Sequence, residues 1–588
     1  MFANFSTRKH QPLRVLGCGS DGAAFLIGVI PNTGQAGVVE EFFELFKTPW
    51  ELYRPGRVYD VVVATADEIP EIRPKLLLVY SAAPVNLDAR IDVTVRKREQ
   101  SATLNHRDTA FPVYGECLTF ADGTKGIACV TAKSGTAGVT VEASGSTLIR
   151  LGYDLFEEVR FLLSAGQPFE HAHIPTLDIH IGMLRDWILE AGISILEIPP
   201  APAGHDFFIC LTHDIDFVGI RKHKFDHSMW GFVYRATFGA VRNLFRRKIS
   251  ASQLLKSWRA VASLPFVYAG WAKDFWEPFD WYLEVEKGLP TTYFLIPFKQ
   301  RSGENVPGAR GSLRATAYDV SDLSHWTTVL LSRGCELGVH GIDAWHSIEK
   351  GREELARISA VTGEPKTGTR IHWLLRDENT PSVLERAGYA YDSTFGYNET
   401  IGYRAGTSQV FRPLGARTLL ELPLHIQDGA LFYPQRLDLS ERAAEARCQA
   451  LIGNVRELGG VLTLLWHDRS HAPERFWGDF YARLVLKLRS LDAWFGTGTQ
   501  VVSWFGKRRK VRFEPVEAAD GITGISLRYD GEEISPPLKI RVHHPRQVVK
   551  ESTESSLTAS DFVDISWAGG IDEQSDQVLP EILVASGS

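Results

Sequence analysis

The feature that most constrains the fold of this chain is a regular alternation of short apolar runs with helix-like stretches between Phe207 and about Phe505. The apolar runs are Phe207–Leu211, Thr291–Pro297, Glu336–His340, Leu419–Leu424 and Gly460–His467. Alternation of this kind is typical of a parallel β/α architecture, either open or closed into a barrel. In such folds the functional side chains stand at the carboxyl ends of the strands. The residues that end these runs are therefore the candidate functional residues.

The first run is followed by two carboxylates, Asp214 and Asp216, in the sequence Thr-His-Asp-Ile-Asp. Carboxylates two residues apart at a strand end can converge on one site, where one binds a metal ion and the other accepts a proton. The third run is followed by His340, Asp343 and His346. Neutral imidazoles and a carboxylate suit Zn²⁺ or a similar divalent ion. Either pattern alone is also compatible with an ordinary turn or a hydrogen-bonded strand end.

The last run ends in Trp466-His467-Asp468. The pKa of an unperturbed imidazole is close to neutral pH, so a histidine in this position suits general acid catalysis. A histidine that only caps a strand is the alternative. Taken with the two earlier strand ends, this one predicts a single site built from several strands.

The order of these motifs resembles the polysaccharide deacetylase family, the NodB-homology enzymes of carbohydrate esterase family 4, over roughly residues 205–470. Three further segments agree with that order. Gly368-Thr-Arg370-Ile-His-Trp373 resembles the arginine motif of the family, and Ala390-Tyr-Asp392-Ser-Thr-Phe395 resembles its aspartate–serine stretch. Glu421-Leu-Pro-Leu-His425-Ile-Gln-Asp428 resembles its fourth motif. The resemblance implies an α/β fold, a distorted (β/α) barrel, and hydrolysis of an N-acetyl or related acyl group on a sugar.

Carried over by position, the resemblance implies a role for each matching residue. Asp214 matches the general base, and Arg370 matches the residue that holds this base. Asp216 and His340 match metal ligands, with His346 as the third ligand of a divalent ion, most plausibly zinc. His467 matches the general acid, with Asp428 as its orienting carboxylate. Trp373, at the end of the arginine motif, is a candidate for substrate contact.

This chain departs from the family pattern in two places. The usual spacing is His-x-x-x-His, but Ala344 stands at that position and the second histidine is His346. On a regular helix a residue six positions on lies about 240° round the axis. His346 can therefore join His340 only if a loop carries it back, and Asp343 is the rival ligand. The second departure is the extra residue in Thr-His-Asp-Ile-Asp, which we expect to bring His213 near the metal.

Residues 221–270 look like a basic, aromatic insertion. They contain ten Lys and Arg residues and one acidic residue, Asp226. Helical spacing predicts that Arg235, Arg242 and Arg246 share one face, with aromatic side chains opposite. A basic amphipathic helix is typical of contact with a membrane surface or a lipid-linked glycan. Binding of an anionic substrate, or simple packing of the aromatics onto the barrel, are the alternatives. We expect no nucleic-acid partner, since no known binding module is visible.

The rest of the chain predicts accessory parts. Residues 1–200 are expected to form an α/β accessory domain, and residues 506–545 a small β-rich segment. Residues 546–588 are predicted to be an acidic, disordered tail, since residues 551–588 hold eight of the acidic residues and no Lys or Arg. Gly17-Cys-Gly-Ser-Asp-Gly22 matches the dinucleotide pattern GxGxxG but lacks its context, and a glycine-rich turn is the simpler interpretation.

Composition places the chain among ordinary globular proteins. Hydrophobic residues make up 44% and charged residues 23%, with a net charge of −7. The amino terminus lacks the apolar core of a secretory signal, so we expect a cytoplasmic location, with possible peripheral contact at the inner membrane surface. The sequence thus predicts a metal-dependent sugar deacetylase. Its rivals are a catalytically inactive glycan-binding or scaffold protein, and a hydrolase of a non-sugar C–N amide bond.

Overall fold

The computed structural model describes residues 13–16, 25–143, 145–307, 310–518, 521–545 and 562–569. Its contacts divide the chain into two compact units. One comprises residues 1–166, 174–203 and 504–588, and the other residues 167–173 and 204–503. The glycine-rich segment Gly17–Gly22 lies outside the described residues. Every candidate site residue belongs to the second unit, which we call the sheet unit.

The sheet unit is built on a curled, parallel sheet with the strand order β17-β16-β15-β14-β13-β12-β19-β18, and β20 pairs with β12. Its strands are β12 (Phe207–Ile215), β13 (Thr291–Leu295), β14 (Glu336–Gly341), β15 (Thr369–Ile371), β16 (Tyr391–Asp392), β17 (Leu420–Glu421), β18 (Ile426–Gln427), β19 (Val461–Leu465) and β20 (Ala493–Phe495). Within the described residues no pairing joins β17 to β18. The sheet is therefore open at this point, whereas the resemblance implied a barrel.

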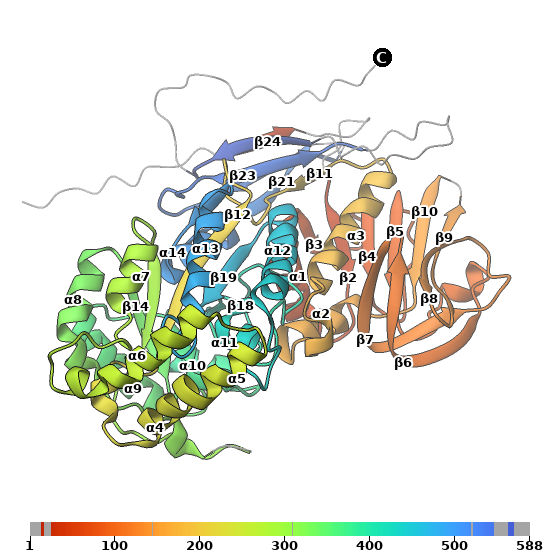
Figure 1. The fold of residues 1–588 in the computed structure, drawn as a ribbon. Coiled ribbons are helices and arrows are strands. Elements are labelled where there is room, and N and C mark those ends of the chain that lie inside the picture. Colours follow the sequence, from red (N-terminus) through yellow and green to blue (C-terminus); the bar gives the residue numbers. More distant parts are fainter. Residues whose placement is uncertain are drawn as a thin grey trace, which may run out of the picture. The chain divides into compact units, whose positions relative to one another are not determined.

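The central strands of this sheet are buried along their whole length. All nine residues of β12 and all five of β13 and of β19 are buried. Continuous apolar runs of this kind are expected where helices cover both faces of a parallel sheet. The helices of the unit lie around the sheet (Figure 1). They are α4 (His227–Tyr234), α5 (Ala240–Phe245), α6 (Ala251–Tyr268), α7 (Phe279–Val285), α8 (Ser324–Ser332), α9 (Ile348–Thr362), α10 (Thr380–Ala387), α11 (Asp428–Phe432), α12 (Glu441–Leu458) and α13 (Gly478–Arg489).

The predicted insertion folds as helices α4, α5 and α6, with a π-helical turn, Arg235–Gly239, between the first two. Asp226 caps α4 by accepting a hydrogen bond from the backbone of Met229, and Ser250 caps α6 through a capping box with Gln253. The inner faces of these helices form a small core of their own. It contains Ile220, Phe232, Ala236, Ala260, Leu264, Val267, Trp276 and Ala472.

The other unit contains a nine-stranded mixed sheet in the order β3-β2-β4-β5-β10-β9-β7-β6-β8. Its strands are β2 (Ile27–Ile30), β3 (Trp50–Leu52), β4 (Val61–Ala64), β5 (Leu76–Tyr80), β6 (Val95–His106), β7 (Thr109–Phe120), β8 (Ile127–Ala132), β9 (Gly135–Ala143) and β10 (Ser146–Leu151), and its helices are α1 (Ala36–Phe46), α2 (Leu155–Ser164) and α3 (Thr176–Glu190). The strands β4 and β5 are apolar and fully buried, as in a central parallel sheet.

The carboxyl-terminal strands complete two small sheets of this same unit. The strand β22 (Gly521–Arg528) pairs with β1 (Leu13–Leu16) and β21 (Arg512–Ala518), while β23 (Leu538–His543) pairs with β11 (Ile195–Glu197) and β24 (Phe562–Trp567). The helix α14 (Gly498–Lys510) precedes them. Within residues 506–545, β22 and β23 each pair with a strand from an earlier part of this unit, β1 and β11 respectively. Residues 562–567 are a strand within the predicted disordered tail.

None of the helices in the described part of the chain is both long enough and apolar enough to span a bilayer.

Candidate metal and catalytic site

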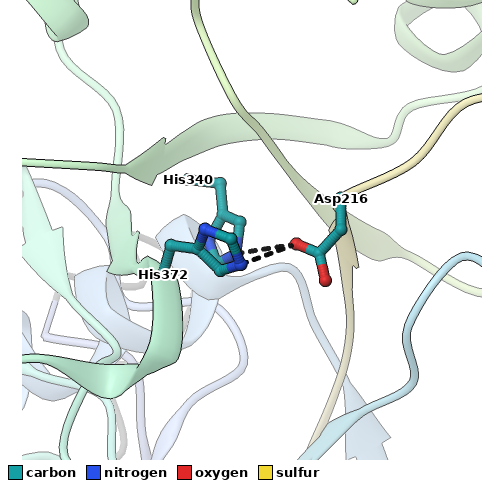
Figure 2. A group of neighbouring side chains, drawn as sticks. All are labelled: Asp216, His340 and His372. Atoms are coloured by element: carbon teal, nitrogen blue, oxygen red, sulfur yellow. Dashed lines mark ion pairs between the residues drawn. The ribbon is translucent and has the colours of Figure 1, made fainter. Parts of the chain in front are cut away.

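One histidine-rich group lies at the carboxyl ends of three strands of the sheet. Asp216 follows β12, His340 is near the end of β14, and His372 follows β15. The carboxylate oxygen Oδ1 of Asp216 lies 3.3 Å from Nε2 of His340 and 3.5 Å from Nε2 of His372. Figure 2 shows both imidazoles facing this carboxylate. These three side chains can each offer one ligand atom to the same ion.

Strand alternation explains how the chain brings these groups together. Residues two apart on a strand share a face, so Asp214 and Asp216 point the same way, as do Arg370 and His372. In the parallel pairing of β14 with β15, His340 is opposite Arg370. After His372 the chain turns sharply, because Trp373 and Leu374 both have positive φ angles, of 66° and 54°. Such left-handed residues cost roughly 1–2 kcal/mol each outside glycine and tend to cluster at functional sites.

The atoms of this group fit a divalent metal ion. The Nδ1–H of His340 donates to the backbone carbonyl of Arg370 at 2.8 Å, which leaves the lone pair of Nε2 facing Asp216. Nε2 of His340 and Oδ1 of Asp216 are buried without a hydrogen-bond partner among the described residues. Buried polar atoms rarely stay unpaired. Two imidazoles and one carboxylate are also a common donor set for zinc.

The protonation of the three groups agrees with a ligand role. Burial lowers the pKa of His372 to about 4, so this imidazole is neutral near pH 7. Burial alone would raise the pKa of Asp216, but the facing imidazoles of His372 and His340 hold it well below its usual range. Burial likewise opposes protonation of His340, whereas Asp214 and Asp216 raise its pKa. Metal binding at this group therefore competes with protons only at His340.

The predicted base, Asp214, is held by the predicted arginine. Nη1 of Arg370 donates to Oδ1 of Asp214 at 3.0 Å and to Oγ1 of Thr212 at 2.7 Å. The other nitrogens of Arg370 donate to the carbonyl and the hydroxyl of Ser393. Arg370 is fully buried and Asp214 is 2% exposed. The guanidinium thus fixes the orientation of the Asp214 carboxylate.

The predicted acid, His467, is paired with the predicted carboxylate, Asp428. Nδ1 of His467 donates to Oδ1 of Asp428 at 2.6 Å, and its backbone N–H donates to Oδ2 at 2.9 Å. Ser470 and the backbone of Gly429 also donate to this carboxylate. Burial opposes protonation of His467, yet Asp428 raises its pKa to about 10. The imidazole therefore carries a proton at neutral pH.

The predicted base, the histidine–aspartate group and the predicted acid all line one pocket of the sheet unit, which has a volume of about 440 Å³. This is within the range of roughly 300–1,000 Å³ for small-molecule sites. Asp214, Asp216, His340, His372 and His467 border it, as does Trp373. The remaining polar lining consists of Arg314, Asn398, Gln427, Tyr433, Gln435, Arg436, Asp468, Arg469 and Arg475. A base, a ligand set and an acid thus face a common space.

His346 was predicted to lie with Asp216 and His340, but in the structure it lies beside Glu304 and Asp343. Nε2 of His346 lies 3.7 Å from both Asp343 and Glu304. Lys350 contacts both of these carboxylates at 3.0 Å. Asp343 also pairs with the buried Arg314 at 2.9 Å. His346 is in the turn before α9, which begins at Ile348, so no helical turn returns it toward His340. The rival ligand Asp343 is likewise engaged by two cations.

His372 is the ligand candidate that the sequence-based reasoning missed. The signal was present, because His372 stands two residues after Arg370 and so shares its face of the strand. His213, in contrast, was expected near the metal but points to the other face. Its ring donates to the carbonyl of Trp466 at 2.9 Å and contacts Glu286 at 2.7 Å. His213 is fully buried and belongs to the core.

No family model and no curated protein matches the chain. Among solved structures it is similar to Agd3, a carbohydrate deacetylase, at 10% identity, covering 94% of this chain and 99% of that one (TM-score 0.35). It is also similar to a probable polysaccharide deacetylase from Pseudomonas aeruginosa PAO1 at 12% identity, covering 52% and 93% (TM-score 0.31). PuuE allantoinase is similar at 13% identity, covering 52% and 92% (TM-score 0.32). Function is therefore inferred from the geometry of the site.

Proposed function

We propose that this protein is a metal-dependent hydrolase of C–N bonds that removes an acyl group, most plausibly N-acetyl, from a sugar-containing substrate. The observation that carries this function is the shared pocket, in which an arginine-held carboxylate, a histidine–aspartate ligand group and a protonated histidine all face one space. Amide hydrolysis needs these three groups, namely a base for water, an electrophile for the carbonyl and an acid for the leaving nitrogen.

Asp214 is the general base. It removes a proton from the attacking water as the water oxygen bonds to the acyl carbon. The contact with Arg370 at 3.0 Å supports this role, because it fixes the direction of the carboxylate. Arg370 is a positioning residue, since its nitrogens are occupied by Thr212, Asp214 and Ser393.

Asp216, His340 and His372 hold the divalent ion, with zinc favoured by the donor set. When bound, such an ion supplies Lewis acidity toward the acyl carbonyl oxygen. Asp216 provides the negative charge of the group, and the hydrogen bond from His340 to the carbonyl of Arg370 fixes which nitrogen is presented. Outside this group, Asp468 also borders the pocket. Burial and the neighbouring Asp216 raise its pKa to about 7.

His467 is the general acid. When the C–N bond breaks, its proton passes to the leaving nitrogen, so that the products are a carboxylate and a free amine. Asp428 supports this role in two ways, since it orients the ring through Nδ1 and it stabilises the protonated form. The Nε2 atom is then the one that can reach the substrate. Trp373, on the wall of the pocket, offers an apolar ring against which a sugar can pack.

The test combines metal analysis with acetate release from N-acetylglucosamine oligomers. Full-length wild type, Asp216→Ala, His372→Ala and His346→Ala are stripped with a chelator, incubated with Zn²⁺ and desalted. We expect zinc and acetate release in the wild type and in His346→Ala, which is the matched control. Both should be lost in the other two variants. A wild-type chain that retains no divalent metal would overturn the proposal.

The same samples separate the rival functions. A wild type that keeps zinc and binds the oligomers, but releases no acetate, would be a glycan-binding or scaffold protein. A wild type that hydrolyses a simple N-acetylated amine but none of the sugars would act on a non-sugar amide.

A further inference from the structure

Two arginines in the wall of the pocket, Arg469 and Arg475, lie against aromatic rings and form no ion pair with a carboxylate among the described residues. Arg469 is 8% exposed, and its guanidinium carbon lies over the rings of Phe217 at 3.7 Å and Trp276 at 4.8 Å. Its Nε atom is buried without a hydrogen bond among the described residues. Buried charges are normally paired or bound to a ligand. Asp468 and Glu474 offset part of the charge of Arg469, but neither forms an ion pair with it among the described residues.

Arg475 adds a second positive charge to the same wall. Its guanidinium lies over the rings of Tyr433 at 5.1 Å and Trp477 at 4.9 Å. No ion pair joins it to a carboxylate in the part of the chain that the structure describes, and both arginines border the pocket. Burial, together with the charge of Arg475, lowers the pKa of Arg469 to about 10. Burial opposes ionisation of Arg475, whereas Tyr433 and the carboxylates of Glu474, Asp428 and Asp468 raise its pKa. The charge of Arg475 still disfavours that of Arg469, and an anion bound beside both would relieve this repulsion.

Aromatic rings hold both arginines by their flat faces, which leaves the N–H groups at the edges free to donate. A planar guanidinium used in this way suits the bidentate binding of a carboxylate or a phosphate. Both arginines follow β19 on the segment that also carries the proposed acid, His467. An anion bound here would therefore belong to the sugar part of the substrate, whose nitrogen His467 protonates.

We propose that Arg469 and Arg475 form an anion subsite, so that the substrate is an acylated sugar bearing a carboxylate or a phosphate. That the substrate is an acylated sugar depends on the proposed function. The anion subsite is argued from the two arginines alone. The neutral sugars of simple chitin-like polymers would leave these two charges unpaired. The proposal thus narrows the substrate class to acidic or phosphorylated sugars.

The test is calorimetric binding to the zinc-loaded full chain. The probes are N-acetylglucosamine 1-phosphate, N-acetylmuramic acid, which carries a carboxylate, and neutral N-acetylglucosamine. We expect one charged sugar to bind at least about tenfold more tightly than the neutral one, since hydrogen bonds to charged groups contribute roughly 1.5–3 kcal/mol. The charged sugar that is preferred then distinguishes phosphate from carboxylate.

Variants assign this preference to the arginines. Arg469→Gln and Arg475→Gln should each remove most of the preference for the charged sugar. Because Arg475 is only partly buried, the Arg475→Gln variant tests the subsite even if Arg469→Gln does not fold. Arg483→Gln is the control, because Arg483 is an exposed arginine paired with Glu441 outside the pocket. Equal affinity for all three probes, or an equal loss in the control, would overturn the subsite. Binding without turnover would refute the proposed function and leave the subsite standing.

A different observation concerns the outer face of the insertion. Half of the exposed large hydrophobic side chains in the described chain belong to residues 225–271. They are Phe225, Trp230, Tyr234, Phe238, Phe245, Leu255, Trp258, Phe266 and Trp271. Phe238 is 74% and Phe245 83% exposed. The aromatics therefore do not all pack onto the sheet unit, which was the simpler alternative. Two pairs of these rings are in contact, Tyr234 with Phe238 and Phe266 with Trp271. Exposed aromatics that gather in this way mark a contact surface.

Exposed cations accompany these rings. Arg242, Arg246, Arg247, Lys256 and Arg259 are exposed, and no ion pair involves them among the described residues. Arg235 differs from the prediction of a shared basic face, because it is only partly exposed and its Nε is buried. The π-helical turn at 235–239 explains this difference, since it interrupts the regular spacing between Arg235 and the arginines of α5 and the turn after it.

We infer that this face binds the surface of an anionic lipid bilayer. Aromatic side chains with flanking Lys and Arg are the combination that adsorbs amphipathic helices to acidic membranes. The ten cations and one acid of residues 221–270 match the charge of such a surface. The insertion also packs on the pocket segment, since Ser257 donates to the carbonyl of Pro473 at 2.7 Å. A substrate anchored in the bilayer would then be close to the pocket.

Co-sedimentation of the full chain with vesicles tests this surface. Vesicles of phosphatidylcholine alone are compared with vesicles that also contain phosphatidylglycerol. We expect binding to the anionic vesicles only, and a loss of at least about tenfold in Phe238→Ser/Phe245→Ser and in Arg242→Gln/Arg246→Gln, since each cation near an acidic membrane contributes about 1 kcal/mol. Leu486→Ser, at a leucine that is 70% exposed on α13, is the control. Vesicle binding that these substitutions leave unchanged would overturn the inference. Self-association of the wild type that the same substitutions abolish would also overturn it, because the face would then bind a second copy of the chain.

Discussion

The sheet unit holds two groups of histidine and carboxylate side chains that look alike by composition. One contains Asp216, His340 and His372, and the other Glu304, Asp343 and His346. In the first group the carboxylate faces only imidazoles at 3.3 and 3.5 Å. In the second, Lys350 and Arg314 already contact the carboxylates at 2.9–3.0 Å. Both groups consist of imidazoles and carboxylates, but among the described residues only the first has no Lys or Arg paired with its carboxylate.

The difference also appears in the cause of each pKa shift. Burial opposes ionisation of both Asp216 and Asp343, and both keep a pKa below the usual value. For Asp216 the stabilising charges are imidazoles, which can lose their protons and become ligands. For Asp343 they include the backbone N–H of Glu304 and the cations Lys350 and Arg314, which a metal ion would have to displace. A metal site is therefore recognised by the absence of competing cations as much as by its donors.

Removing His372 should have the largest effect. In His372→Ala we expect zinc to be lost and kcat to fall by about a thousandfold, since a metal ion supplies several kcal/mol of transition-state stabilisation. Zinc content and acetate release measure this. Full activity in His372→Ala would show that His372 is not a metal ligand and would favour the group of Glu304, Asp343 and His346.

The pH profile should respond to Asp428→Asn. Asp428 raises the pKa of His467 to about 10, so the protonated acid persists up to about that pH in the wild type. Without this carboxylate the proton is lost at lower pH, and the alkaline limb of kcat should shift downward. The rate near neutral pH should fall by roughly a hundredfold, as expected when a general acid is impaired. An unshifted alkaline limb would show that another group donates the proton.

Asp343→Ala should change stability and not metal binding. Arg314 is fully buried, and removing its partner leaves an uncompensated charge, which costs about 3 kcal/mol. Urea unfolding of the full chain should shift to lower concentrations, while the zinc content stays that of the wild type. Loss of zinc from a folded Asp343→Ala protein would contradict the assignment of this group as structural.

His346→Ala should have the smallest effect. Its ring is 3.7 Å from two carboxylates that Lys350 already neutralises, so we expect activity within about twofold of the wild type. The measurement is acetate release at saturating zinc. A drop as large as that of His372→Ala would reverse the comparison between the two groups.

Much of the site could be predicted from strand ends. Asp214, Asp216, His340, Arg370 and His467 all meet at one pocket, because the carboxyl ends of parallel strands share an edge and residues two apart share a face. The pairing of Asp428 with His467 also agrees with the prediction. The third ligand could not be assigned from the spacing rule, since that rule assumes a helix directly after His340, whereas β14 is followed by a turn that carries Asp343 and His346 to Lys350.

The accessory parts were predicted less well for a related reason. The runs Val61–Ala64 and Leu76–Tyr80 are buried strands. The strand β22, however, pairs with β1, and β23 pairs with β11, each from a distant part of the chain. Sequence separation conceals such partners, because the hydrogen bonds of a sheet edge carry no local signature.

The sequence by itself determined which side chains stand at the strand ends, and hence several of the residues that line the pocket. Only the tertiary structure decided which histidine lies beside Asp216 and His340, and which carboxylates are already paired with a cation. The physical reason is that strand periodicity is a local property of the backbone, whereas the charge balance around a buried side chain is set by segments far apart in sequence. Asp343, paired with Arg314, and Asp216, faced by two imidazoles, differ in that respect.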